Sequence, residues 1–149
     1  MEIIRGESEL LLTIRRKEDG VVILRALSAD KTAVLPEEIF GLPVTELEHH
    51  AFAPNRPDTG GEVVRIACGP APAEAPDNSR LTDVTLPASL TVVKKNAFGE
   101  CKKLIEVRYQ GDEASWGKIK FDDTGNGYVL QANRFYRGQD EEVFFTKNL

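Results

Sequence analysis

The sequence predicts a mainly β fold with short helical turns, built from repeats that stack into an irregular solenoid. Three observations predict it. Strand-like segments rich in Leu, Ile and Val lie near the N-terminus, an Ala-Phe pair recurs after 46 residues, and a Leu/Val pattern recurs after half that distance, 23 residues. One repeat of this size cannot cover its own apolar face, so several must stack to bury it.

A β-hairpin is expected over residues 9–26. Glu9–Ile14 and Val21–Ala26 are both rich in β-branched and leucine residues. Between them, Asp19 and Gly20 form a dipeptide that is typical of tight hairpin turns. We expect this hairpin to cover the N-terminal end of the repeat array.

The repeats share a strand pattern. Leu81-x-x-Val84-x-Leu86 recurs 23 residues later as Leu104-x-x-Val107-x-Tyr109, which is the spacing of a leucine-rich-repeat strand. Alternate side chains of a strand point the same way, so Val84 and Leu86 are expected inside and Thr85 outside. Pro87 should end the strand, because proline donates no ladder hydrogen bond.

The second half of the repeat completes the motif. The segment reads Leu-Pro-x-x-Leu-Thr-x-Val-x-x-x-Ala-Phe-x-x-Cys-x-x-Leu-x-x-Val and resembles the BspA-type leucine-rich repeat of bacterial surface and gut-associated proteins. The matching positions are Leu86, Pro87, Leu90, Thr91, Val93, Ala97, Phe98, Cys101, Leu104 and Val107. Residues 35–52 resemble a variant with a Gly-x-Pro-Val-Thr insert, and residues 109–132 resemble the segment that often closes such arrays. The resemblance implies an interaction or adhesion module rather than an enzyme.

One segment departs from the pattern. Leu81 follows Phe52 by 29 residues instead of six, and the Pro/Gly-rich insert 53–80 fills the gap. Val63-x-x-Ile66-x-Cys68 inside it matches the strand spacing, so one interpretation is a degenerate coil followed by an Ala/Pro-rich loop. The alternative is a plain disordered excursion. Residues 69–79 lack large apolar side chains and are expected to be exposed and mobile.

The expected organisation is a single domain over residues 1–149. It comprises the hairpin 9–26, the leucine-rich repeats 33–109 with the insert 53–80, and a C-terminal capping segment 110–149. Within the cap, Phe135-Tyr136 and Val143-Phe144-Phe145 are expected to be half-buried terminal strands.

Composition excludes some partners. The net charge is −5 with acidic and basic residues mixed along the chain, which argues against nucleic acid and against an anionic membrane surface. The N-terminus lacks the basic and apolar regions of a signal peptide. The chain is therefore expected to be cytoplasmic as given, while the family resemblance allows the cell surface.

No motif supports catalysis, a cofactor or a metal. His49 and His50 are adjacent, would face opposite sides of a strand, and have no third ligand. Residues 122–127 lack the ligand spacing of a calcium loop and are expected to form a turn. Cys68 and Cys101 are interpreted as two buried free thiols in preference to a disulfide. Trp116 is interpreted as a core residue rather than an exposed anchor.

The expected function is a non-catalytic module for protein–protein interaction or scaffolding. The alternatives are a silent regulatory or accessory domain of a larger system, and an adhesion-type surface protein. The acidic repeat over residues 33–62 precedes a basic repeat over 80–108, so a complementary protein or a second copy is a candidate partner, against the alternative of an ordinary solvated surface. The candidate contact residues are Thr85, Glu106, Arg108, Lys94, Lys95, Lys102 and Lys103.

Overall fold

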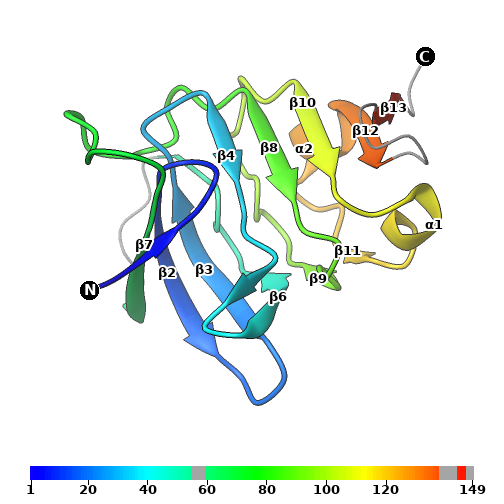
Figure 1. Cartoon of the computed structure of the whole chain (residues 1–149). Helices are drawn as coiled ribbons and strands as arrows, with labels where there is room; N and C mark the ends of the chain where they lie inside the picture. Colours follow the sequence, from blue (N-terminus) through cyan, green and yellow to red (C-terminus); the bar gives the residue numbers. More distant parts are fainter. Residues whose placement is uncertain (55–59, 138–143, 147–149) are drawn as a thin grey trace.

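The computed structural model describes residues 1–54, 60–137 and 144–146, and the chain is mainly β, as expected (Figure 1). Its elements in chain order are β1 (Glu2–Arg5), β2 (Leu10–Arg16), β3 (Val21–Leu27), β4 (Thr32–Val34), β5 (Glu38–Ile39), β6 (Leu42–Leu47), β7 (Glu62–Ala67), β8 (Asp83–Leu86), β9 (Val92–Val93), β10 (Glu106–Tyr109), α1 (Glu113–Trp116), β11 (Lys120–Phe121), α2 (Gly127–Gln131), β12 (Asn133–Arg137) and β13 (Phe144–Thr146).

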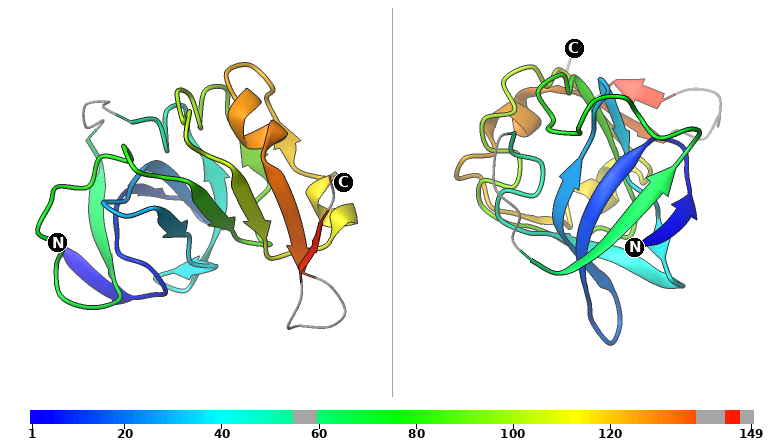
Figure 2. Two further views of the ribbon diagram at one scale, coloured as in Figure 1. Left: turned by 90° about the horizontal axis from the view of Figure 1, so that it is seen from above. Right: turned by 90° about the vertical axis from the view of Figure 1, so that its left-hand side faces the viewer.

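The strands form two sheets. The first has the order β1-β7-β2-β3-β6-β9-β11, with β5 paired to β6, and the second has the order β13-β12-β10-β8-β4. From β8 to β12, strands of the second and first sheets alternate along the chain. Both sheets contribute to one hydrophobic core, and Figure 2 shows the neighbouring strands of the second sheet running side by side.

The register of the parallel strands confirms the repeat period. β8 and β10 pair in parallel with Asp83 opposite Glu106 and Leu86 opposite Tyr109, one period apart. β6 and β9 pair in parallel with Leu47 opposite Val93, which is twice the period. Because equivalent residues pair directly, Val84, Leu86, Val107 and Tyr109 all point into the core and are buried, as the spacing predicted.

The turn after each strand of the first sheet repeats the same backbone geometry. His50 and Asn96 both lie in the left-handed region, with φ of 66° and 58°, and the His50 N–H donates to the Asn96 carbonyl over 3.2 Å. Gly125 takes this role in the next turn, with φ of 73°. His50 and Asn96 show that other residues adopt this conformation, but a Cβ at Gly125 would overlap the side-chain amide of Asn96, so glycine is favoured there by the lack of space.

The C-terminal segment extends both sheets. β11 adds to β9 with Lys120 opposite Val92, and β12 adds to β10 with Glu106 opposite Asn133. In both pairs the two residues lie further apart in sequence than one repeat period, because the segment that leads to β12 also contains the helices α1 and α2. The expected terminal strand at Phe135-Tyr136 is therefore present as β12, and the backbone of Phe144 and Phe145 lies in β13.

The hairpin is confirmed, whereas the degenerate coil is wrong. β2 and β3 pair antiparallel, and β3 joins the first sheet by parallel pairing with β6. The insert strand β7 pairs with β1 and β2 instead of lying between two repeats, and β4 pairs directly with β8. In β7, Val64 and Ile66 are buried, whereas Val63 is half-buried and Cys68 is exposed, so only Ile66 of the matched spacing lies in the core.

Two buried asparagines close the ends of the turns. The Asn78 side chain accepts from the Ser28 N–H at 2.7 Å and donates to the carbonyls of Ala26 and Phe52. Asn126 accepts from the Phe98 N–H at 3.0 Å and donates to two backbone carbonyls in the same way. Each amide satisfies three backbone groups that no strand pairs. Asn78 is thus an exception to the exposure expected of residues 69–79, most of which are exposed.

The two cysteines are free, as interpreted, but only one is buried. Cys101 is 5 % exposed and its Sγ lies 3.3 Å from the Phe52 carbonyl oxygen, to which it donates. Cys68 is exposed, because β7 ends at Ala67 and the chain leaves the sheet there. The interpretation of two buried thiols is therefore wrong for Cys68.

Candidate interaction surface

Two rows of side chains cross the outer face of the second sheet. In-register pairing places Thr32, Asp83, Glu106 and Asn133 in one row and Val34, Thr85, Arg108 and Phe135 in the next. The residues with inward side chains in these strands fill the core, so the alternation of a strand leaves these rows outside. We call the outer rows the sheet face; its four central half-buried residues are Asp83, Glu106, Arg108 and Phe135.

Arg108 connects the sheet face. Its Nη1 lies 2.9 Å from the Glu106 Oε2 and 3.9 Å from the Asp83 Oδ1, and its guanidinium lies 5.5 Å from the Phe135 ring centroid. The Arg108 side chain is 38 % exposed, so these ion pairs are wet and individually weak. Together they hold a cation and an aromatic ring in place on an otherwise acidic patch.

The predicted contact residue Thr85 does not belong to an open surface. It points outward as expected, but it is only 6 % exposed, between Val34 on β4 and Arg108 on β10. The alternation of inward and outward positions predicts the direction of a side chain but not how far its surroundings cover it. The other two predicted strand residues, Glu106 and Arg108, are half-buried, and their side chains remain accessible.

The four predicted lysines are exposed but divide between two places. Lys94 and Lys95 follow β9 in the first sheet, whereas Lys102 and Lys103 precede β10 in the second. Lys94 lies 4.0 Å from Glu48, which occupies the equivalent position one repeat pair earlier. Some of the opposite charges of the acidic and basic repeats therefore pair with each other within the molecule.

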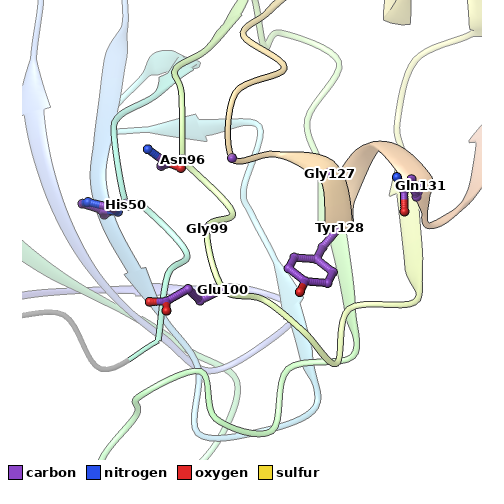
Figure 3. Close-up of a pocket in the computed structure, with 8 residues that line it drawn as sticks. His50, Asn96, Gly99, Glu100, Gly127, Tyr128 and Gln131 are labelled. Carbon is purple, nitrogen blue, oxygen red and sulfur yellow. The ribbon is translucent and has the colours of Figure 1, made fainter.

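A cleft of about 540 Å³ opens beside the turns that follow the first sheet. Figure 3 shows His50 and Asn96 on one side, Tyr128 and Gln131 of α2 on the other, and Glu100 between them. Tyr128 is 42 % exposed. Of the described residues that line the cleft, none is a Ser, Thr, Cys or Lys that could act as a nucleophile.

The two histidines differ from expectation. They lie in a turn rather than a strand, and the left-handed backbone at His50 brings the two rings together, stacked with centroids 3.8 Å apart. His49 Nε2 lies 3.4 Å from the Asn96 amide nitrogen. Both residues are half-buried, and their rings pack against each other.

Within residues 1–54, 60–137 and 144–146, no three His, Cys, Asp or Glu side chains cluster closely enough to hold a metal ion. Across the same described ranges, no helix has the length and apolar character to cross a membrane.

No protein-family model and no curated protein matches this chain. The solved structures include a similar one. It is the leucine-rich repeat protein of T. pallidum, which is 26% identical with a TM-score of 0.46. The similarity covers 65% of this chain and 40% of that protein, so the present chain spans less than half of that protein's length.

Sequence reasoning missed Asp83 and Phe135 as members of the sheet face. Asp83 could have been found by moving one repeat period back from Glu106, since these two residues pair directly. Phe135 follows Arg108 by more than one period, because the intervening turn contains extra helices, and the strict period did not reach it.

Proposed function

We propose that this chain is a non-catalytic protein-interaction module, built as an irregular solenoid of BspA-like leucine-rich repeats. The parallel pairing of β8 with β10, one repeat period apart, supports the repeat assignment, and the alternation of strands between two sheets supports the solenoid. In this proposal the hairpin 9–26 covers one end of the array, and the C-terminal capping segment, described over residues 110–137 and 144–146, closes the other.

The observation that carries the proposal is the composition of the sheet face. Asp83, Glu106, Arg108 and Phe135 present acidic, basic and aromatic groups side by side on rigid strands. Arginine and aromatic residues are enriched where protein interfaces gain most of their binding energy. A face with both charge signs and one ring fits a protein partner better than a polyanion.

The predicted lysines have unequal roles in this proposal. Lys102 and Lys103 lie where β10 begins and border the sheet face, so they add a basic rim. Lys94 and Lys95 lie at the other sheet and are assigned to a separate surface. Charge at a rim mainly changes the association rate and its dependence on salt.

Two matched variants test the proposal. We expect wild type immobilised on a support to retain a defined partner from an extract of the source organism, identified by mass spectrometry. The double variant Arg108→Glu/Phe135→Ala should lose that partner, whereas Lys94→Glu/Lys95→Glu should retain it. Equal retention by both variants would show that the sheet face is not the contact surface.

Self-association is tested separately. Light scattering from about 0.1 M to 1 M salt, where the Debye length falls from ~10 Å to ~3 Å, should detect a charge-mediated complex of two copies. A mass that stays monomeric at all salt concentrations, in wild type and in a variant with all four lysines reversed to Glu, removes the second copy as the partner.

A further inference from the structure

The core contains an arginine where its repeat partners have small apolar residues. Ala33, Val84, Val107 and Arg134 pair side by side across β4, β8, β10 and β12, and all four point inward. The first three are 0% exposed and Arg134 is 9% exposed. A guanidinium at this position must be stabilised by something other than apolar packing, because burying a charge without a partner is unfavourable.

The surroundings of Arg134 are aromatic. Its guanidinium lies 4.6 Å from the Trp116 ring centroid and 6.0 Å from that of Tyr136. Trp116 is the last residue of α1. Tyr136 lies two residues after Arg134 in β12, so its side chain points to the same inward side. The rings orient the guanidinium through cation–π contacts, but a ring face accepts no directed pair of hydrogen bonds.

Two buried donors in this group have no acceptor. The Arg134 Nε and the Tyr136 Oη are both buried, and neither has a hydrogen-bond partner among the described residues. The two terminal nitrogens of Arg134 also make no hydrogen bond or ion pair among the described residues, and Arg134 as a whole is 9% exposed.

We propose that Arg134, framed by Trp116 and Tyr136, binds an oxyanion, either a carboxylate or a phosphate group. A planar guanidinium that is held by aromatic rings, and whose terminal nitrogens have no partner among the described residues, presents the fork that pairs with two oxygens of such a group. The oxyanion comes from a small solute or from an acidic side chain of a partner protein. This site is separate from the sheet face and does not depend on the function proposed above.

The chain contains its own probe for this site. Trp116 is the only tryptophan and lies against the guanidinium, so an oxyanion bound to Arg134 changes the indole environment and its fluorescence. Titration with sodium phosphate and with sodium acetate, at constant ionic strength set by sodium chloride, should give a saturable change in emission. Sodium chloride alone should give none.

Matched variants distinguish specific binding at Arg134 from a general effect of the protein's positive charge. Arg134→Met should weaken the response about tenfold or more, since the charge-assisted pair is lost. Arg137→Met removes the same charge from the exposed side of β12 and should leave the response unchanged. Arg134→Lys, which keeps the charge without the planar fork, should bind more weakly than wild type. It also gives a folded comparison if Arg134→Met is unstable.

The two sources of the oxyanion differ in these titrations. Saturation by phosphate at lower concentration than by acetate or by a peptide rich in Glu indicates a small solute, and the reverse order indicates an acidic partner. The proposal is overturned if no oxyanion changes the emission saturably, or if Arg134→Met and Arg134→Lys both respond as wild type does. Loss of sheet-face binding in the Arg108→Glu/Phe135→Ala variant has no effect on this result.

Discussion

Phe52 and Phe98 stack face to face in the core, with ring centroids 4.8 Å apart and planes inclined by only 6°. They occupy the same place in two repeats, separated by two repeat periods. The backbone follows the same relationship, since the Phe52 N–H donates to the Ala97 carbonyl over 2.7 Å. Both side chains are 0% exposed. This aromatic pair links the coils before and after the insert.

Removing one ring of this pair should strongly destabilise the fold. Phe98→Ala should lower the free energy of unfolding by ~3–5 kcal/mol, because a buried ring is lost and a cavity remains. Phe52→Ala should act similarly, and the double variant should deviate from additivity because the rings are in contact. Lys95→Ala, an exposed control in the same repeat, should stay within about 0.5 kcal/mol. Equal denaturant midpoints for Lys95→Ala and Phe98→Ala would contradict the register.

Asn78 should stabilise the chain despite lying in the insert. Asn78→Ala leaves the Ser28 N–H and the Ala26 carbonyl without these hydrogen bonds and leaves the Phe52 carbonyl with only the Cys101 thiol, at a cost of at least about 1–3 kcal/mol. Asn78→Gly relieves the left-handed backbone, where φ is 64°, but should still be destabilising. The exposed control Asn133→Ala should have a small effect in the same urea titration. A neutral Asn78→Gly would show that the hydrogen bonds contribute nothing.

The segment 69–76 should be the first site of limited proteolysis. The only hydrogen bond between its described backbone and the body of the protein is from Arg65 to the Gly69 carbonyl, and Glu74 is exposed. A protease specific for glutamate should therefore cut after Glu74 before any other position, and Glu74→Gln should remove that cut. Cleavage elsewhere first, with Glu74 protected, would mean that the segment is packed. Because Asn78 is buried and bonded, residues 77–80 should resist longer.

The two thiols should differ sharply in reactivity. Cys68 is exposed, whereas burial raises the pKa of the Cys101 thiol from about 9 to about 12. At pH 8 in native buffer, a thiol reagent should label one cysteine per chain, and Cys68→Ser should abolish this labelling. The second thiol should react only after denaturation. Labelling of two thiols in the native protein would contradict the packing around Cys101.

The same buried thiol makes stability depend on pH. The folded chain keeps Cys101 protonated while the unfolded chain ionises near its ordinary pKa, so the stabilisation is complete below pH 9 and is lost as the pH rises toward 12. Cys101→Ala should remove this part of the alkaline loss of stability. Thermal unfolding of the two proteins across this pH range measures the difference.

The sequence by itself determined the repeat period, the inward strand positions and the hairpin. These features depend on local alternation and on turn residues such as Asp19-Gly20 and Pro87, whose effects act within a few residues. The sequence analysis reached Glu106 as a contact residue but not Asp83, which pairs with it directly.

Only the tertiary structure decided where the insert goes and what each outward residue contacts. β7 reached β1 and β2 because those strands left an edge to pair with, and nothing within β7 encodes that choice. Thr85 is buried between β4 and β10 although it points outward, and a turn of irregular length brings Trp116 against Arg134. Exposure and contact are properties of several segments at once, so a local pattern does not specify them.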